Sequence, residues 1–440
     1  MGKPIASQTL AADSGALYVS EKKIHPREVD GRFQRLRHLA AFVLLGLFYL
    51  APWLRWDGRQ AVLFDLPARK FYVLGLSFWP QDFVFLALLL VMAGVALFFF
   101  TTLAGRLWCG YACPQTVWTE VFVAIERWAE GDRNAQMKLA AAPWTAAKWR
   151  KRGLKHAGWL VLALWTGFTF VGFFTPIREL ADRVVPFAWS GWETFWVGFY
   201  ALATWGNAGV LREQVCKYMC PYARFQSAMF DADTLVIAYD TARGEPRGAR
   251  KRGVAPSLLD LGDCIDCTIC VQVCPTGIDI RNGLQYECIG CAACIDVCDT
   301  VMDKMNYPRG LIRFTTQNAL AGSWPARQMW ARVLRPRVLT YGALLLALSV
   351  GVLGSLAMRT PLKVDVVRDR AALSRLVAGG KLENVYRLQI MNATEQPQHY
   401  RISAKGLDGL QVASDAEVAV GPAESRWVAV PPTSAASSAA

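Results

Sequence analysis

The stretch CIDCTICVQVCP at Cys264–Pro275, followed by CIGCAACIDVCD at Cys288–Asp299, decides how the middle of this 440-residue chain folds. Each run spaces three cysteines two residues apart and places a fourth three residues further on. This is the spacing of bacterial ferredoxins, in which a tight loop aims three thiolates at one iron–sulfur cube and the fourth ligates the other cube. The two runs therefore predict an α+β domain with two [4Fe–4S] clusters.

Crossed ligation of this kind divides the eight thiolates into two sets. We expect one set to be Cys264, Cys267, Cys270 and Cys298, and the other to be Cys274, Cys288, Cys291 and Cys294. A zinc site with four cysteines is the alternative, but zinc sites favour two separated Cys-x2-Cys pairs over triple runs. The second run ends in Asp299 where Pro275 ends the first, which departs from the commonest ferredoxin pattern.

The chain is too apolar for a purely soluble protein, because 53% of its residues are hydrophobic and only 19% are charged. A helix needs about 20 apolar residues to cross a bilayer. Five stretches qualify, the first being the shortest: Leu39–Leu54, Phe83–Ala104, Ala157–Ile177, Thr194–Leu211 and Val338–Met358. Phe71–Trp79 is apolar but too short to cross, so we expect a re-entrant or interfacial segment there. The sequence thus predicts an α-helical membrane protein with five transmembrane helices.

The distribution of Lys and Arg predicts the orientation in a bacterial inner membrane. Residues 1–38, 106–156 and 212–337 carry seven, nine and sixteen basic residues, whereas 55–82 and 178–193 carry four and two. Because cytoplasmic loops are enriched in Lys and Arg, the first three segments are expected inside and the C-terminus in the periplasm. The net charge of +13 then reflects topology and contact with anionic membrane lipid, and nucleic-acid binding is not indicated.

These signals divide the chain into five parts. They are a cytoplasmic segment 1–38, a four-helix membrane region 39–230, a cytoplasmic ferredoxin domain with a basic loop 231–337, a fifth transmembrane helix 338–358, and a periplasmic region 359–440. The last region contains short β-prone segments, which predict a small β-sandwich: Val385–Met391, Tyr400–Ala404, Ala416–Val420 and Trp427–Val430. The tail Pro432–Ala440 is rich in Pro, Ser and Ala and is expected to be disordered.

One motif occurs twice, as Cys109-Gly-Tyr-Ala-Cys113-Pro114 and as Cys216-Lys-Tyr-Met-Cys220-Pro221. Residues four apart share a helical face, so each pair of thiols can point the same way at the inner membrane surface. The four cysteines are therefore candidate catalytic residues that form one site. That site could hold a third cluster, bind a soft metal such as Cu(I), or act as a dithiol redox pair. Two pairs of buried cysteines without a ligand are the remaining alternative.

No glycine-rich dinucleotide motif follows a predicted strand, so electrons are expected from a separate cytoplasmic donor. The basic loop Arg243–Arg252 could contact lipid or dock an acidic donor. His38 and His156 lie at the inner starts of predicted spans and could help bind a metal, a quinone or haem, although an ordinary interfacial role is the simpler interpretation.

The ferredoxin runs, Val301–Met305, Pro308–Arg313, Arg243–Gly248 and the two Cys-x3-Cys-Pro units together resemble the FixG/RdxA/CcoG family of cytochrome c oxidase accessory proteins. The resemblance covers nearly the whole chain and implies five spans, a two-cluster ferredoxin insert and an outer immunoglobulin-like domain. It implies a role in maturing the cbb3-type oxidase by reducing Cu(II) to Cu(I), with copper-delivery or oxidase-assembly proteins as partners. One departure is that the outer domain stops after Val430, where the family supplies a further strand.

Two other functions fit the same residues. The chain could be an electron-transfer subunit between the quinone pool and a partner reductase, or a redox sensor or scaffold whose outer domain holds a partner. The sequence leaves the oligomeric state open, including a homo-oligomer.

Overall fold

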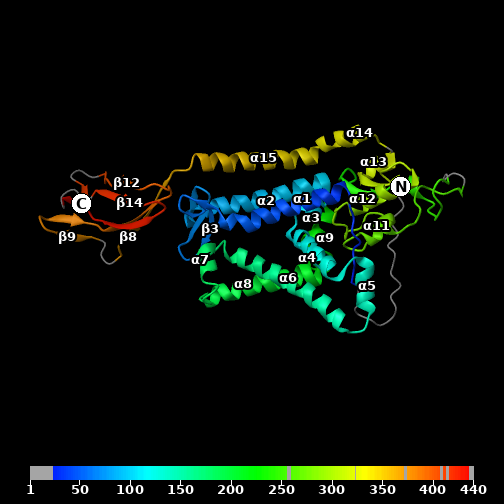
Figure 1. Cartoon of the computed structure of the whole chain (residues 1–440). Helices are drawn as coiled ribbons and strands as arrows, with labels where there is room; N and C mark the ends of the chain where they lie inside the picture. Colours follow the sequence, from blue (N-terminus) through cyan, green and yellow to red (C-terminus); the bar gives the residue numbers. More distant parts are fainter. Residues whose placement is uncertain are drawn as a thin grey trace, which may run out of the picture.

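The computed structural model describes residues 23–254, 259–322, 324–370, 374–406, 410–412 and 416–435. The molecule is elongated (Figure 1). Long helices run along its middle, the cysteine-rich elements α11 and α12 lie at one end, and a β-rich C-terminal domain lies at the other.

Within the described residues, four helices are long and apolar enough to cross a membrane. They are α1 (Arg32–Leu50), α2 (Phe83–Ala104), α6 (Ala146–Val171) and α15 (Pro336–Ala357). The bounds of α2 coincide with the predicted span, because nothing in its 22 residues is charged. Many of its large apolar side chains, such as Phe83 and Leu90, are exposed, which suits contact with lipid.

The predicted span Thr194–Leu211 is not one long α-helix. The α-helix α8 (Gly191–Thr204) has 14 residues, and the chain continues as the π-helix η3 (Trp205–Leu211). Helix α8 is about 21 Å long, shorter than a hydrocarbon core of about 30 Å. The described residues therefore contain four candidate spans, and the expected fifth is not shown. The wider turns of η3 bring Gly209 against the ring of Trp159, where an added Cβ would be 3.0 Å from the ring.

Further helices follow α2 and follow η3, and they contain the two copies of the repeated motif. The first copy of the repeated motif gives α3 (Leu107–Tyr111) and then α4 (Pro114–Glu130), whereas the second gives the π-helix η4 (Val215–Met219) and then α9 (Pro221–Ala228). In both copies proline occupies the first helical position, where its missing N–H costs no hydrogen bond. Helix α5 (Arg133–Ala141) follows α4.

The cysteine-rich domain has the α+β character that the runs predict. Its elements are β6 (Val236–Tyr239), α10 (Thr241–Gly244), α11 (Ile269–Gln272), the 3-10 turn η6 (Ile280–Asn282), α12 (Ala293–Met305) and β7 (Ile312–Thr315). Strands β6 and β7 pair antiparallel and cover a core that includes Ile237, Met302 and Leu311. Helices α13 (Gln317–Gly322) and α14 (Ala326–Ala331) and the turn η7 (Arg332–Leu334) lead to α15.

A small β structure lies at the opposite end of the helices. It comprises β1 (Arg55–Trp56), β2 (Arg59–Gln60), β3 (Val62–Asp65), β4 (Lys70–Val73) and β5 (Leu76–Phe78), flanked by η1 (Ala51–Trp53), η2 (Pro80–Asp82) and α7 (Ile177–Asp182). The segment Phe71–Trp79, which we expected to be re-entrant or interfacial, therefore supplies strands of the sheet β3-β4-β5. Its apolar side chains alternate around a tight turn, and Ser77 and Trp79 are buried in the protein.

The C-terminal domain is built from three small sheets, ordered β15-β11-β8, β13-β16-β10-β9 and β12-β14. The strands are β8 (Leu362–Arg368), β9 (Arg375–Val377), β10 (Lys381–Glu383), β11 (Tyr386–Asn392), β12 (Gln398–Arg401), β13 (Gln411–Val412), β14 (Glu417–Val420), β15 (Ser425–Val430) and β16 (Pro432–Ala435). Their core contains Ile390, Val418 and Val420. The four predicted strands are present, as β11, β12, β14 and β15.

The prediction that this domain stops after Val430 is wrong. Strand β16 follows at once and pairs antiparallel with β10 and with β13. The expected disorder over Pro432–Ala440 is therefore also wrong for residues 432–435, while 436–440 lie outside the described residues. Pro432 is tolerated because it is the first residue of the strand, and the small side chains of Thr433 and Ser434 are buried where they pack into the sheet.

Candidate functional site

The eight ferredoxin cysteines surround two adjacent cavities. The first has an empty volume of about 380 Å³ and is lined by Cys264, Cys267, Cys270 and Cys298. The second has about 340 Å³ and is lined by Cys274, Cys288, Cys291 and Cys294, with Cys270 on the shared wall. The structure thus brings the cysteines together in the two sets that crossed ligation requires. That these sets bind iron stays a prediction.

The two runs fold alike. The residue after the second cysteine, Thr268 or Ala292, has a left-handed backbone with φ of 56° or 63°, and a helix begins at the next residue. This turn aims the three closely spaced thiols of each run to one side. Helix α12 continues past Cys298 to Met305, and proline at position 299 would interrupt it. Asp299 keeps the helix intact and accepts a hydrogen bond from the Gly310 backbone N–H at 2.9 Å.

The chemistry of these cavities fits iron–sulfur clusters. The cysteine sulfurs of each set line a cavity, as the corners of an iron–sulfur cube require. Burial raises the pKa of Cys288 to about 12 and that of Cys270 to about 11. Such thiols become thiolates at neutral pH when bound iron supplies the compensating positive charge.

The four cysteines of the repeated motif also lie together. Cys109 is in α3 and Cys216 in η4, whereas Cys113 and Cys220 precede the prolines of α4 and α9. Burial raises the pKa of Cys109 to about 12, and the charges of the other three cysteines push it the same way. The Cys109 thiol donates a hydrogen bond to Gln226 Oε1 at 3.4 Å. We call these four residues the thiol face.

The thiol face contacts the second ferredoxin run directly. Cys109 and Cys216 pack against the buried cluster of Val273, Ile289, Cys291 and Ala293. Gly110 lies so close to the run that an added Cβ would be 2.9 Å from the backbone of Gly290. The cavity of the Cys274 set therefore adjoins the thiol face, and the cavity of the Cys264 set lies behind it.

Buried polar contacts fix this arrangement. Arg106, which is 6% exposed, donates to the backbone carbonyls of Tyr286, Cys288 and Ala223, so one side chain joins the ferredoxin run to α9. The Asp296 carboxylate accepts from the backbone N–H groups of Phe33 and Gln34 at 3.2 and 2.8 Å, so α12 caps the start of α1. Sequence reasoning missed Arg106, Gly110 and Asp296, because their roles depend on segments far apart in the chain.

Other predicted residues have structural contacts. In the basic loop, Arg243 pairs with Asp263 at 2.5 Å and the guanidinium of Arg250 lies over the ring of Tyr307. The side chain of His38 lies 2.9 Å from that of Gln34, and the ring of His156 packs edge-on against Trp159. The structure does not bring either histidine into a group placed to hold a single metal ion within the described residues.

Comparison with known families gives three matches. Residues 211–317 match a 4Fe-4S dicluster domain, residues 84–129 match a 4Fe-4S binding domain, and residues 352–438 match the IG-like fold at the C-terminus of FixG. The second match contains Cys109 and Cys113 but none of the eight ferredoxin cysteines.

Curated proteins match along most of their length. Nitrogen fixation protein FixG of Rhizobium meliloti is 41% identical over 424 residues, which cover 89% of this chain and 81% of that protein. Proteins RdxB and RdxA of Cereibacter sphaeroides are each 41% identical, over 89% and 90% of this chain and 83% and 85% of theirs. The crystal structure of a FixG-related protein from Vibrio parahaemolyticus is 28% identical and covers 18% of this chain and 72% of that one. Its TM-score is 0.17, too low to inform the fold.

Proposed function

Because the chain belongs to the FixG/RdxA/RdxB family of membrane iron–sulfur proteins, we propose that it passes electrons from a cytoplasmic donor to the thiol face. There it reduces Cu(II) to Cu(I) for assembly of a cbb3-type oxidase. The observation that carries this proposal is the contact between Gly110 and Gly290, which places the thiol face against the second ferredoxin run. Copper-delivery or oxidase-assembly proteins are the proposed recipients.

The residues divide the work. The two sets of ferredoxin cysteines hold [4Fe–4S] clusters, which supply one-electron transfer when bound. Each Cu(II) takes up one electron that originates from the donor, and the bonds that break in the protein are the S–H bonds of the thiols that bind the product. Thiolate sulfur is a soft ligand that suits Cu(I), so the thiol face holds the product. Because burial keeps the pKa of Cys109 and Cys216 at about 12, binding of the product releases thiol protons.

The decisive variant changes all four cysteines of the thiol face to Ala. We expect purified variant protein to keep the iron content of the wild type but to lose Cu(II) reduction, followed as formation of a Cu(I)–chelator complex. Met219→Leu is the matched control, because it alters an exposed side chain within the same motif and leaves the thiols in place. Reduction of Cu(II) by the four-cysteine variant at the wild-type rate would show that the proposed route is wrong.

A second function rests on a different observation. The matched 4Fe-4S binding domain at residues 84–129 favours a third cluster on the thiol face, and the chain would then be an electron-transfer subunit between the quinone pool and a partner reductase. Counting iron, sulfide and copper in anaerobically purified protein, with EPR, separates the two. Eight irons per chain support the copper proposal, and twelve support the third cluster.

A further inference from the structure

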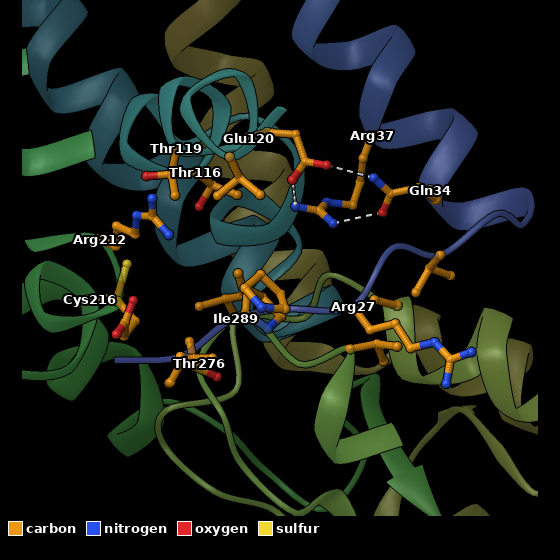
Figure 2. A pocket seen from close by; sticks show the side chains of 18 of the residues that line it. Arg27, Gln34, Arg37, Thr116, Thr119, Glu120, Arg212, Cys216, Thr276 and Ile289 are labelled. Atoms are coloured by element: carbon orange, nitrogen blue, oxygen red, sulfur yellow. Dashed lines mark hydrogen bonds and ion pairs between the residues drawn. The ribbon is translucent and has the colours of Figure 1, made fainter. Parts of the chain in front are cut away.

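A cavity lies beside the thiol face (Figure 2); its empty volume of about 750 Å³ includes space open to solvent, and both polar and apolar side chains line it. Its walls come from the N-terminal segment 24–29, α1, α4, the start of η4 and both ferredoxin runs. Cys216 lines it on one side and Ile289 and Ala293 of the second run on another. A molecule in this cavity would therefore contact a thiol and the wall of the nearer cluster cavity together.

The charges around the cavity favour an anion. Four arginines line it, Arg27, Arg37, Arg127 and Arg212, against two carboxylates, Glu120 and Glu213. Figure 2 shows Arg37 engaged with Glu120, and the ion pair measures 2.7 Å. Arg127 pairs with Glu28 at 3.2 Å. Arg212 shares the buried Glu126 with Lys23 and Lys155, and Lys155 also pairs with Glu130. Three cations therefore face two carboxylates beside Arg212, which leaves an excess of positive charge there.

Arg212 has hydrogen-bonding capacity to spare. It is 4% exposed, its Nη2 donates to Glu126, and its Nε donates to the Gly209 carbonyl at 2.9 Å. Its Nη1 is buried and has no hydrogen-bond partner among the described residues, and the same is true of Nε of Arg127. The guanidinium of Arg212 also lies 5.3 Å from the centre of the Trp159 ring. Buried donors left unpaired are costly, so an acceptor bound in the cavity would be stabilised by these two nitrogens.

We propose that this cavity binds the copper substrate as an anionic chelate, with copper held by small-molecule carboxylates, and that Arg212 and Arg127 recognise those carboxylates. This inference rests on the proposed function and names its substrate class. A hydrated Cu²⁺ ion would be repelled by the excess of positive charge beside Arg212, whereas guanidinium matches carboxylate oxygens in charge and geometry. The chelate would deliver its copper next to Cys216, and the ligand would leave after the metal is reduced.

The test separates binding from reduction. Chromium(III)–EDTA is a substitution-inert anion, and hexaamminechromium(III) is an inert cation, so neither transfers metal to thiols. We expect the full-length oxidised protein to bind the anion in a calorimetric titration and not the cation. Arg212→Lys and Arg127→Gln should each weaken this binding at least about tenfold, and Arg150→Gln, an exposed arginine outside the cavity, should leave it unchanged. The anion should also slow reduction of Cu(II)–nitrilotriacetate in competition.

Three outcomes would overturn the inference. They are equal binding of anion and cation, wild-type affinity in both arginine variants, or affinity for inorganic phosphate equal to that for the chelate. These three outcomes concern binding only, so they would leave the proposed reduction of copper standing. If instead the wild type binds chromium(III)–EDTA but reduces neither anionic Cu(II)–nitrilotriacetate nor cationic Cu(II)–diethylenetriamine, the proposed function fails, and with it the assignment of copper as the bound metal.

Discussion

Gly110 sets how closely the thiol face approaches the ferredoxin run, because an added Cβ would lie 2.9 Å from Gly290 and 3.0 Å from the Ile289 carbonyl oxygen. These neighbours are backbone atoms and cannot swing aside. We expect Gly110→Ala to cost about 1–3 kcal/mol of stability. It should also slow the reoxidation of reduced protein by Cu(II) by about tenfold to a hundredfold, since small misplacements of reacting groups are costly. Stopped-flow absorbance of the clusters measures the rate.

Gly153→Ala is the matched control for that variant. Gly153 lies in α6 with nothing within 4 Å of an added Cβ, so alanine there should leave the rate unchanged and stabilise the helix by about 0.5–1 kcal/mol. Equal reoxidation rates in Gly110→Ala and in the wild type would mean that electrons do not leave through this contact.

Glu126 is the buried centre of an ion-pair network. It is 1% exposed and pairs with Lys23 at 2.8 Å, with Lys155 at 3.5 Å and with Arg212. Burial alone would raise the pKa of Glu126, but Arg212 and Lys23 outweigh it and lower that pKa to about 2. Glu126→Gln leaves these cations uncompensated and should cost about 3–5 kcal/mol at pH 7.

The lowered pKa of Glu126 also determines how the stability of the fold depends on pH. Its ionised carboxylate stabilises the fold fully above the unfolded pKa near 4.5 and loses that effect as pH falls through about 2. Thermal unfolding followed by tryptophan fluorescence should therefore give a constant difference between wild type and Glu126→Gln from pH 6 to 8. The difference should shrink below pH 4.5. A difference that grows on acidification would contradict the ion-pair network.

At the scale of elements, the sequence predicted those features that depend on residues close together in the chain. The spacing of the cysteines anticipated which thiols share a cavity, and an uncharged run of 22 residues anticipated α2. Local patterns did not predict what neighbours decide: η3 widens its turns beside Trp159, and Phe71–Trp79 forms strands of a sheet whose first strand precedes it. Arg212 could not be recognised as a candidate binding residue, because its partners Glu126 and Trp159 lie on α4 and α6, far from it in the sequence.

Strand β16 shows how composition can mislead. Pro, Thr, Ser and Ala suggested disorder, yet residues 432–435 lie between β10 and β13 and hydrogen-bond to both. Truncation after Pro431 should remove those bonds, each worth roughly 0.5–1.5 kcal/mol, and destabilise the C-terminal domain by several kcal/mol. Truncation after Ala435 keeps the strand and is the control. Limited proteolysis of the full-length membrane protein should cleave the domain rapidly only in the shorter chain, and equal resistance would argue against a structural role for β16.

At the scale of the whole molecule, the long helices separate the cysteine-rich sites from the C-terminal domain. The ferredoxin runs, the thiol face and the arginine-lined cavity gather at one end, and the C-terminal domain lies at the other (Figure 1). The basic residues concentrate in the segments at the ferredoxin end. Donor, relay and copper site would then share one compartment, with the C-terminal domain free to meet a partner across the membrane.

That arrangement requires an odd number of crossings, so we propose that α8 and η3 together make one more crossing besides the four candidate spans. Residues 191–211 return from α7 toward the ferredoxin end, and Arg212 ends the return. We therefore expect alkaline phosphatase, which is active only outside the cytoplasm, to be active when fused after Phe187 or at the C-terminus. It should be inactive when fused after Gly253. A fluorescent protein that folds only in the cytoplasm should fluoresce when it is fused after Gly253. If α8 and η3 do not cross, phosphatase should instead be active after Gly253 and inactive at the C-terminus. The fusion after Phe187 should remain active in both cases. That reversal would put the iron–sulfur domain outside and refute both the five-span topology and the cytoplasmic donor.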